Sequence, residues 1–195
     1  MLTAEIDALN FGYNEDYQFI DFDLEPFDWG DVCPFTVIVD TREQAPFHFV
    51  GCEPWPLIPI WNIALATGDY SISGFEDRMT IERKSISDLL GSITAGRDRF
   101  EREFERMNAL EFSAVVIEGQ LSDVLRHARD NTSLLLKSII GTFDAWRIRY
   151  PRVHWIFCLD RRHAELQTLG LMQHFWKEEQ KKQKEMKRDT AAKTP

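Results

Sequence analysis

Cysteines and long apolar runs are scarce in this sequence of 195 residues. The three cysteines, Cys33, Cys52 and Cys158, are too few and too scattered for a disulfide framework, which favours the reducing cytoplasm of a bacterial or phage-infected cell. No stretch approaches about 18 consecutive apolar residues, and the first residues show no basic start to a secretory signal. Neither a membrane span nor export is therefore expected. The absence of CxxC, HxxH and HxxxH spacings argues against a structural zinc site.

Lysine and arginine are missing from residues 1–31, although the chain carries 23 of them against 32 Asp and Glu, a net charge of −9. Residues 32–195 are therefore balanced, with 23 charges of each sign. A balanced domain can carry a local basic groove for nucleic acid beside an acidic site. We divide the chain into an acidic N-terminal extension (1–32), a main domain (33–176) and a basic C-terminal helix end and tail (177–195). The acids of the extension are Glu5, Asp7, Glu15, Asp16, Asp21, Asp23, Glu25, Asp28 and Asp31.

Strand and helix patterns alternate along the main domain and predict an α/β fold around one mixed central sheet. Runs rich in β-branched residues indicate buried strands, and apolar residues at helical spacing indicate amphipathic helices. The expected strands are 35–40, 60–65, 78–83, 114–118 and 153–159, with a hairpin turn over 73–77. Four helices are expected. The first begins at Ser85, and the others span 97–110, 134–146 and 161 to about 188.

Charged residues gather at three predicted strand ends, at 40–43, 68–70 and 82–84. Because residues i and i+2 of a strand face the same side, Glu82 and Lys84 are expected on one face and Arg83 on the other. If the strands around Asp69 and Glu82 pair as a hairpin, both carboxylates can reach one divalent ion. Mg²⁺, or Mn²⁺ in its place, prefers such oxygen ligands and lowers the pKa of a bound water. Lys84 would orient that water or stabilise charge on the phosphorus. The alternative is a solvated strand edge with surface salt bridges.

The order of the motifs favours the metal site over a solvated strand edge. Gly68-Asp69-Tyr70 precedes Glu82-Arg83-Lys84 and Asp88, and Asp40 and Glu43 come earlier, after the first predicted strand. Over roughly residues 35–175 the sequence resembles the XPF-type structure-specific endonucleases, whose nuclease domains carry an Asp-x-x-Glu, a GDY and an ERKxxxD motif in this order. The resemblance implies a single restriction-endonuclease-like domain, its mixed sheet flanked by helices, that cleaves DNA near branch points, flaps or junctions.

The resemblance also implies roles for individual residues. Asp69 and Glu82 would bind the metal, Lys84 would be the catalytic lysine, and Arg83 would act beside them. Asp88 would orient Lys84 or an arginine. Asp40 and Glu43 would help to hold the metal or a second ion, and Arg42 and Arg97 would contact DNA. The family's optional second acid is replaced here by Ser87, and residues after 119 offer only Gly141 and Gly170, too few glycines for the helix-hairpin-helix module of many relatives.

We therefore expect a Mg²⁺-dependent endodeoxyribonuclease with DNA as partner, acting as a homodimer or heterodimer through the nuclease domain. The alternative is a nuclease-like module that binds DNA or a partner without cutting. The apolar stripe of the 134–146 helix is expected in the core, with a dimer face as the alternative. Trp55 and Trp61 are expected to pack, with base stacking as the alternative. The acidic extension is expected to be loosely packed or to dock on a basic surface.

Overall fold

The structure is a computed structural model, and it describes residues 32–52, 54–131 and 136–193. The expectations for the acidic extension fall on residues outside this description. Six strands form one mixed sheet in the order β2-β1-β3-β4-β5-β6. The middle pairs β1–β3 and β3–β4 are antiparallel, and the outer pairs β1–β2, β4–β5 and β5–β6 are parallel. The strands are β1 (Val37–Val39), β2 (Ile60–Asn62), β3 (Tyr70–Ile72), β4 (Met79–Lys84), β5 (Phe112–Ile117) and β6 (Val153–Phe157).

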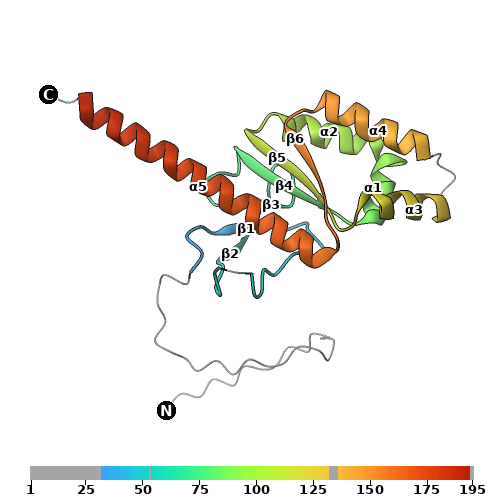
Figure 1. Ribbon diagram of the computed structural model, residues 1–195, viewed down its shortest axis with the longest axis horizontal. Helices are drawn as coiled ribbons and strands as arrows, with labels where there is room; N and C mark the ends of the chain where they lie inside the picture. The colour runs from blue at the N-terminus through green and yellow to red at the C-terminus, as the bar shows by residue number, and fades with distance from the viewer. Residues whose placement is uncertain (1–31, 53, 132–135, 194–195) are drawn as a thin grey trace, which may run out of the picture.

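Five helices cover this sheet. Figure 1 shows α5 crossing one face, while the other four helices gather around the β5–β6 end. Their bounds are α1 (Ile86–Ile93), α2 (Arg97–Asn108), α3 (Leu121–Asn131), α4 (Leu136–Arg149) and α5 (Arg161–Lys193). The α/β class with a mixed central sheet, expected from the sequence, is confirmed. In the part of the chain that is described, no helix is both long and apolar enough to cross a membrane.

The two faces of the sheet bury separate hydrophobic cores. On β5, Val116 belongs to the core under α5, whereas Val115 and Ile117 belong to the core under α1 to α4. This alternation is the two-residue period of a strand that is covered on both sides. The second core is largely aromatic, with Phe100, Phe104 and Trp146 fully buried.

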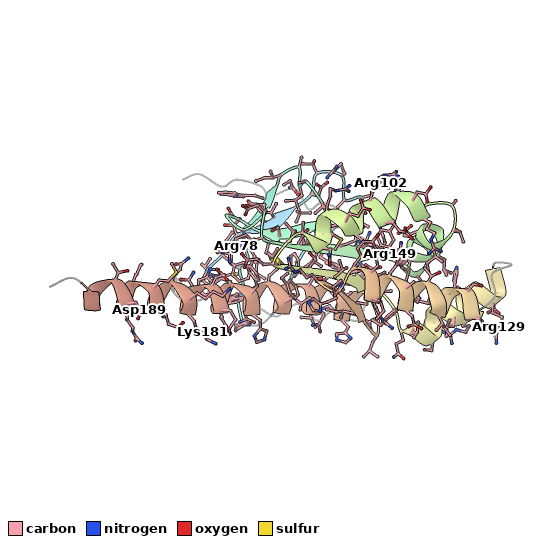
Figure 2. The ribbon with its side chains drawn as sticks, turned by 90° about the horizontal axis from the view of Figure 1, so that it is seen from above. Arg78, Arg102, Arg129, Arg149, Lys181 and Asp189 are labelled. Atoms are coloured by element: carbon pink, nitrogen blue, oxygen red, sulfur yellow. The ribbon has the colours of Figure 1, made fainter. Side chains whose placement is uncertain are left out.

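Helix α5 has 33 residues, and only its first part packs on the sheet. Its first half is buried through residues such as Leu169 and Met172. Glu179 is the last buried anchor, in a 2.7 Å ion pair with Arg78 from the β3–β4 turn. Lys181 and Asp189 then lie on the part of α5 that extends past the sheet (Figure 2). The predicted C-terminal helix end is therefore an uninterrupted continuation of α5 as far as the description reaches.

Candidate active site

Asp69 and Glu82 lie side by side because β3 and β4 pair as a hairpin. Tyr70 is opposite Ile81, and one step along each strand brings Asp69 next to Glu82. The Asp69 N–H donates to the Ile81 carbonyl over 2.9 Å, and Asp69 Oδ2 accepts the Arg83 N–H over 2.7 Å. The hairpin that the sequence analysis made a condition for a shared metal ion is present.

Gly68 permits this close approach. Its φ of +73° lies in the left-handed region, which costs glycine little. A Cβ at this position would also lie 2.1 Å from Thr80 Oγ1, so a larger residue would push β4 away. The first residue of the Gly-Asp-Tyr motif thus allows β4 to come within reach of Asp69.

Glu82 and Lys84 project from one face of β4, as the strand period predicted. Lys84 Nζ donates to Glu82 Oε1 over 2.5 Å and lies 4.8 Å from the centre of the Phe100 ring. Both side chains are largely withdrawn from solvent, with exposed fractions of 12% for Lys84 and 5% for Glu82. The pair therefore sits where charge interactions are only weakly screened.

Burial sets the charge state of this group. It raises the pKa of Asp69 to about 7, opposed in part by the hydrogen bond from the Arg83 N–H. Burial and the neighbouring charge of Asp69 raise the pKa of Glu82 well above its usual value. Burial disfavours the charge on Lys84, but the attraction of Glu82 outweighs it and raises the pKa of Lys84. The two carboxylates therefore repel each other in a setting where one lysine cannot neutralise both.

Asp40 follows β1 and is held by an arginine. Its Oδ1 accepts Arg42 Nε and its Oδ2 accepts Arg42 Nη2, each over 2.7 Å, and Oδ2 also accepts the Leu65 N–H over 2.6 Å. Burial acts to raise the pKa of Asp40, but these hydrogen bonds prevail and lower it. Arg42 keeps 68% of its side chain exposed at the rim of the site. Asp40 thus orients a cationic side chain rather than presenting free oxygens.

Glu43 is likewise engaged by an arginine, on the α5 side of the sheet. Its carboxylate accepts Arg83 Nη2 over 3.0 Å and Nε over 3.2 Å. Arg83 Nη1 donates to Glu118 Oε1 over 3.0 Å, and Arg161 from α5 donates to the same oxygen over 2.5 Å. Arg161 also donates to the carbonyls of residues 45 and 46. Arg83 therefore points away from Glu82, as expected, and joins three elements behind the site.

Asp88 caps α1. Its N–H donates to Ser85 Oγ over 3.2 Å, and the Ser85 hydroxyl donates to Asp88 Oδ2 over 2.6 Å. Ser85 is the N-cap residue, so this is a local helix-start motif. The structure pairs Asp88 with Ser85, whereas the resemblance led us to expect Lys84 or an arginine.

Arg97 is the first residue of α2, and its side chain reaches α4. Its Nε donates to Glu101 over 3.0 Å and its Nη1 to Thr142 over 3.3 Å, while its guanidinium lies 5.5 Å from the centre of the Trp146 ring. These contacts tie α2 to α4. They keep Arg97 out of the lining of the cleft around Asp69 and Glu82.

A cleft of about 430 Å³ opens above the acidic pair. Its floor is Asp69, just before β3, and the end of β4. One wall is the chain after β1 and before β3, and the other wall is α2. Three residues of this wall, Arg99, Glu103 and Arg106, were not singled out from the sequence. Their spacing of four and three residues places them on one face of α2, beside the buried stripe of Phe100, Phe104 and Met107. That spacing could have identified them. The lining residues are Asp40, Arg42, Glu43, Gln44, Ala66, Thr67, Gly68, Asp69, Glu82, Arg83, Lys84, Asp88, Arg99, Glu103 and Arg106.

Comparison with known proteins assigns this arrangement to a family. The model of the ERCC4 domain matches residues 39–166, which run from the last residue of β1 through the cleft to the first turn of α5. The chain belongs to the ERCC4 domain family. This membership confirms the XPF-type nuclease family expected from the sequence motifs.

Solved structures share the fold of this ERCC4 domain. XPF from Aeropyrum pernix is 22% identical, with a TM-score of 0.53 over 71% of this chain and 60% of its own. XPF from Aeropyrum pernix in complex with DNA is 21% identical, with a TM-score of 0.55 over 73% of this chain and 66% of its own. The chain thus spans less than two thirds of each. Curated protein sequences give no significant match.

The acidic pair of the ERCC4 domain fits a divalent cation. Within the described residues nothing donates to Asp69 Oδ1 or to Glu82 Oε2, so one oxygen of each carboxylate is free to act as a ligand. Mg²⁺ suits such a site, because it is often held by one or two carboxylates together with water and substrate phosphate. Among those residues no three Asp, Glu, His or Cys side chains converge closely enough to hold a metal, since Asp40 and Glu43 face arginines. Asp69 and Glu82 are therefore the residues that would hold such an ion, and the companion role of Asp40 and Glu43 stays a prediction.

Proposed function

We propose that this ERCC4 domain is a metal-dependent DNA endonuclease that hydrolyses a phosphodiester bond near a branch, flap or junction. The observation that carries the proposal is the Asp69–Glu82 pair, Glu82 buried and Asp69 partly buried, with Lys84 at the floor of a cleft whose walls bear arginines. Family membership supports the reaction class. The solved XPF from Aeropyrum pernix in complex with DNA supports DNA as the partner.

Asp69 and Glu82 would hold Mg²⁺, or Mn²⁺, through the oxygens that lack a donor. A divalent ion there would polarise the phosphodiester and lower the pKa of water. The chain itself buries Glu82, partly buries Asp69 and fixes Asp69 through the Arg83 N–H. This preorganisation means that binding the ion would relieve repulsion between charges that the fold already forces together.

Lys84 would stabilise charge on the transferred phosphoryl group. Its raised pKa keeps the ammonium charged at neutral pH, and its place over Phe100 leaves only one carboxylate partner. Competition from a cation for Glu82 would free donors of Lys84 for a phosphate oxygen. A preplaced cation of this kind is worth most in a water-poor site.

Arg42, Arg99 and Arg106 are the arginines that would bind the DNA backbone at the cleft rim. Arg99 and Arg106 are exposed, and Arg42 retains the exposed guanidinium described above. Arg42 stands on one wall and the other two on α2, so a strand in the cleft would have cations on both sides. Arg97, expected from the sequence to contact DNA, remains a prediction, because its side chain is engaged with Glu101 and Thr142.

Dimerisation through the nuclease domain also remains a proposal. Of the predicted apolar stripe, Ile139, Phe143 and Trp146 are buried in the core and Ile140 is 43% exposed, while Leu134 and Leu135 lie outside the described residues. Leu136, which was not part of the predicted stripe, is 39% exposed on the same helix. The expectation of core packing is confirmed for the three buried residues. Sedimentation of the full chain with and without DNA would establish whether the two exposed residues meet a second subunit.

The direct test is cleavage of a flap, a fork, a four-way junction, single strands and plain duplex in Mg²⁺ or Mn²⁺. Wild type should cut branched DNA, whereas Glu82→Gln and Lys84→Ala should bind DNA without cutting it. Glu111→Gln, which alters an exposed acid outside the cleft, is the matched control and should cut like wild type. Undiminished cutting by Lys84→Ala would exclude the mechanism. DNA binding without cutting by wild type would favour the non-catalytic module.

A further inference from the structure

Trp61 is an exposed indole on the edge strand β2. It is 56% exposed, and Ile63, two residues later, is 42% exposed. The sequence analysis expected Trp55 and Trp61 to pack. Trp55 does so, with its ring 5.7 Å from that of Phe35. For Trp61 the expectation was wrong, because among the described strands β2 lies at the end of the sheet and pairs with β1 alone.

Trp61 points to the same face of the sheet as Glu82 and Lys84. Its neighbour Ile60 packs against the core under α5, so Trp61, one residue on, faces the opposite side. The strand register agrees, because Trp61 pairs with Ile38, and Ile38 pairs with Ser71 next to Tyr70. The helices on this face pack on β4, β5 and β6, which leaves the β2 edge open.

The chain leads directly from Trp61 to the wall of the cleft. The Ile63 N–H donates to the Val39 carbonyl over 3.0 Å, and the Leu65 N–H donates to Asp40. The Leu65 carbonyl accepts Arg42 Nη2 over 2.6 Å, and residues 66–68 line the cleft. Trp61 and the exposed guanidinium of Arg42 are therefore two positions on one continuous surface that ends at the acidic pair.

We propose that Trp61 is a stacking platform for an unpaired base of the DNA strand whose phosphates enter the cleft past Arg42. The proposal rests on the proposed function, since it assumes that DNA occupies the cleft. An exposed indole on the same surface as an arginine is a combination that holds single strands, because the aromatic face stacks on a base while the cation binds the backbone. Trp61 would thus select substrates with unpaired bases next to the cut.

The size of the apolar patch favours a base over a protein. On and just after β2, the described residues expose two large apolar side chains, Trp61 and Ile63. A stable protein interface buries about 800 Å² on each partner, which two side chains cannot supply. One base, by contrast, needs only one aromatic face.

Binding of the full chain to three kinds of DNA in EDTA, measured by fluorescence anisotropy, tests the proposal without cleavage. The DNAs are a blunt duplex, the same duplex with an unpaired extension at its 3′ or 5′ end, and the extended duplex with abasic sites in the extension. Trp61→Ala should weaken binding to one of the extended duplexes about tenfold and leave the blunt duplex within about twofold. Abasic sites should weaken wild-type binding equally and add nothing to Trp61→Ala. Trp61→Phe should retain most of the affinity.

Ile148→Ala is the matched control, because Ile148 is an 84% exposed apolar residue on α4. It should bind every DNA like wild type. Equal binding of the extended duplexes by Trp61→Ala and wild type would overturn the platform, as would an equal loss on the blunt duplex. Dissociation of a wild-type dimer by Trp61→Ala would assign the surface to a second copy instead. If wild type cuts no DNA but still binds the extended duplexes through Trp61, the proposed catalysis fails and the stacking platform stands.

Discussion

The main-chain N–H of Arg83 donates to Asp69 Oδ2 over 2.7 Å, while the guanidinium of the same arginine is buried on the opposite side of the sheet. One residue therefore fixes a proposed metal ligand with its backbone and anchors the sheet with its side chain. Glu43 and Glu118 share that guanidinium, at 3.0 Å each. A substitution that removes the Arg83 guanidinium is thus expected to disturb the position of Asp69 as well.

Arg83→Met should destabilise the fold strongly. It leaves the buried Glu43 carboxylate without its arginine, and breaking a buried ion pair costs about 3–5 kcal/mol. Arg126→Met, which removes an exposed pair with Asp123, should cost less than about 1 kcal/mol. Urea denaturation of both variants measures the difference. Equal losses would mean that Arg83 is no better coupled to the fold than a surface residue.

Mg²⁺ should stabilise the wild-type chain against unfolding. A ligand that binds only the folded state adds about 2.7 kcal/mol at one hundred times its Kd. Asp69→Asn and Glu82→Gln should abolish the metal-dependent rise in melting temperature, and Glu111→Gln should retain it. A full rise in Asp69→Asn would place the ion elsewhere.

The metal-free protein should lose stability as the pH rises from about 5 to 7. Burial raises the pKa of Asp69 from 3.8 to about 7, so between these values the folded chain holds a proton that the unfolded chain has released. Asp69 then lowers the unfolding free energy by up to about 1.4 kcal/mol per pH unit, and Glu82, whose pKa is also raised, adds to the slope in the same direction. Melting temperatures in EDTA should show this slope, and it should flatten in Asp69→Asn. An unchanged slope in that variant would assign the titration to another group.

Ser85→Ala should cost about 1 kcal/mol, as expected for the loss of an N-cap. Asp88→Ala should cost a similar amount, and the double variant little more, because the two side chains form one motif. Denaturation of the three variants tests this. If Asp88→Ala has normal stability but an altered pH profile of cleavage, the result would support the expected role of Asp88 in orienting Lys84.

Arg99→Gln with Arg106→Gln should weaken binding to all DNAs and lower the slope of log affinity against log salt by about two. Arg102→Gln is the control, because Arg102 lies on the outer side of α2 (Figure 2) and does not line the cleft. Anisotropy titrations over a range of salt concentrations measure both slopes. Equal slopes for the two sets would remove α2 from the proposed DNA path.

Sequence patterns predicted the centre of the site, because it depends on local geometry. The turn at 73–77 and the alternation of Glu82, Arg83 and Lys84 are properties of one hairpin. The partners of the arginines could not be predicted in this way, since Arg161 reaches Glu118 from 43 residues away. Helix α3 was not assigned, although Leu121, Val124, Leu125 and Ala128 show helical spacing. The exposure of Trp61 follows from the order of the strands, which local patterns do not determine.

Helix α5 is fastened at two separated points. Arg161 holds its first turn to Glu118 beside the site, and Glu179 holds Arg78 about 27 Å further along the axis. Residues beyond Lys182 add no buried contact within the described chain. The protruding end of α5 is thus a suitable attachment site. A fluorophore, an affinity tag or a surface tether placed there would leave the cleft open to its substrate.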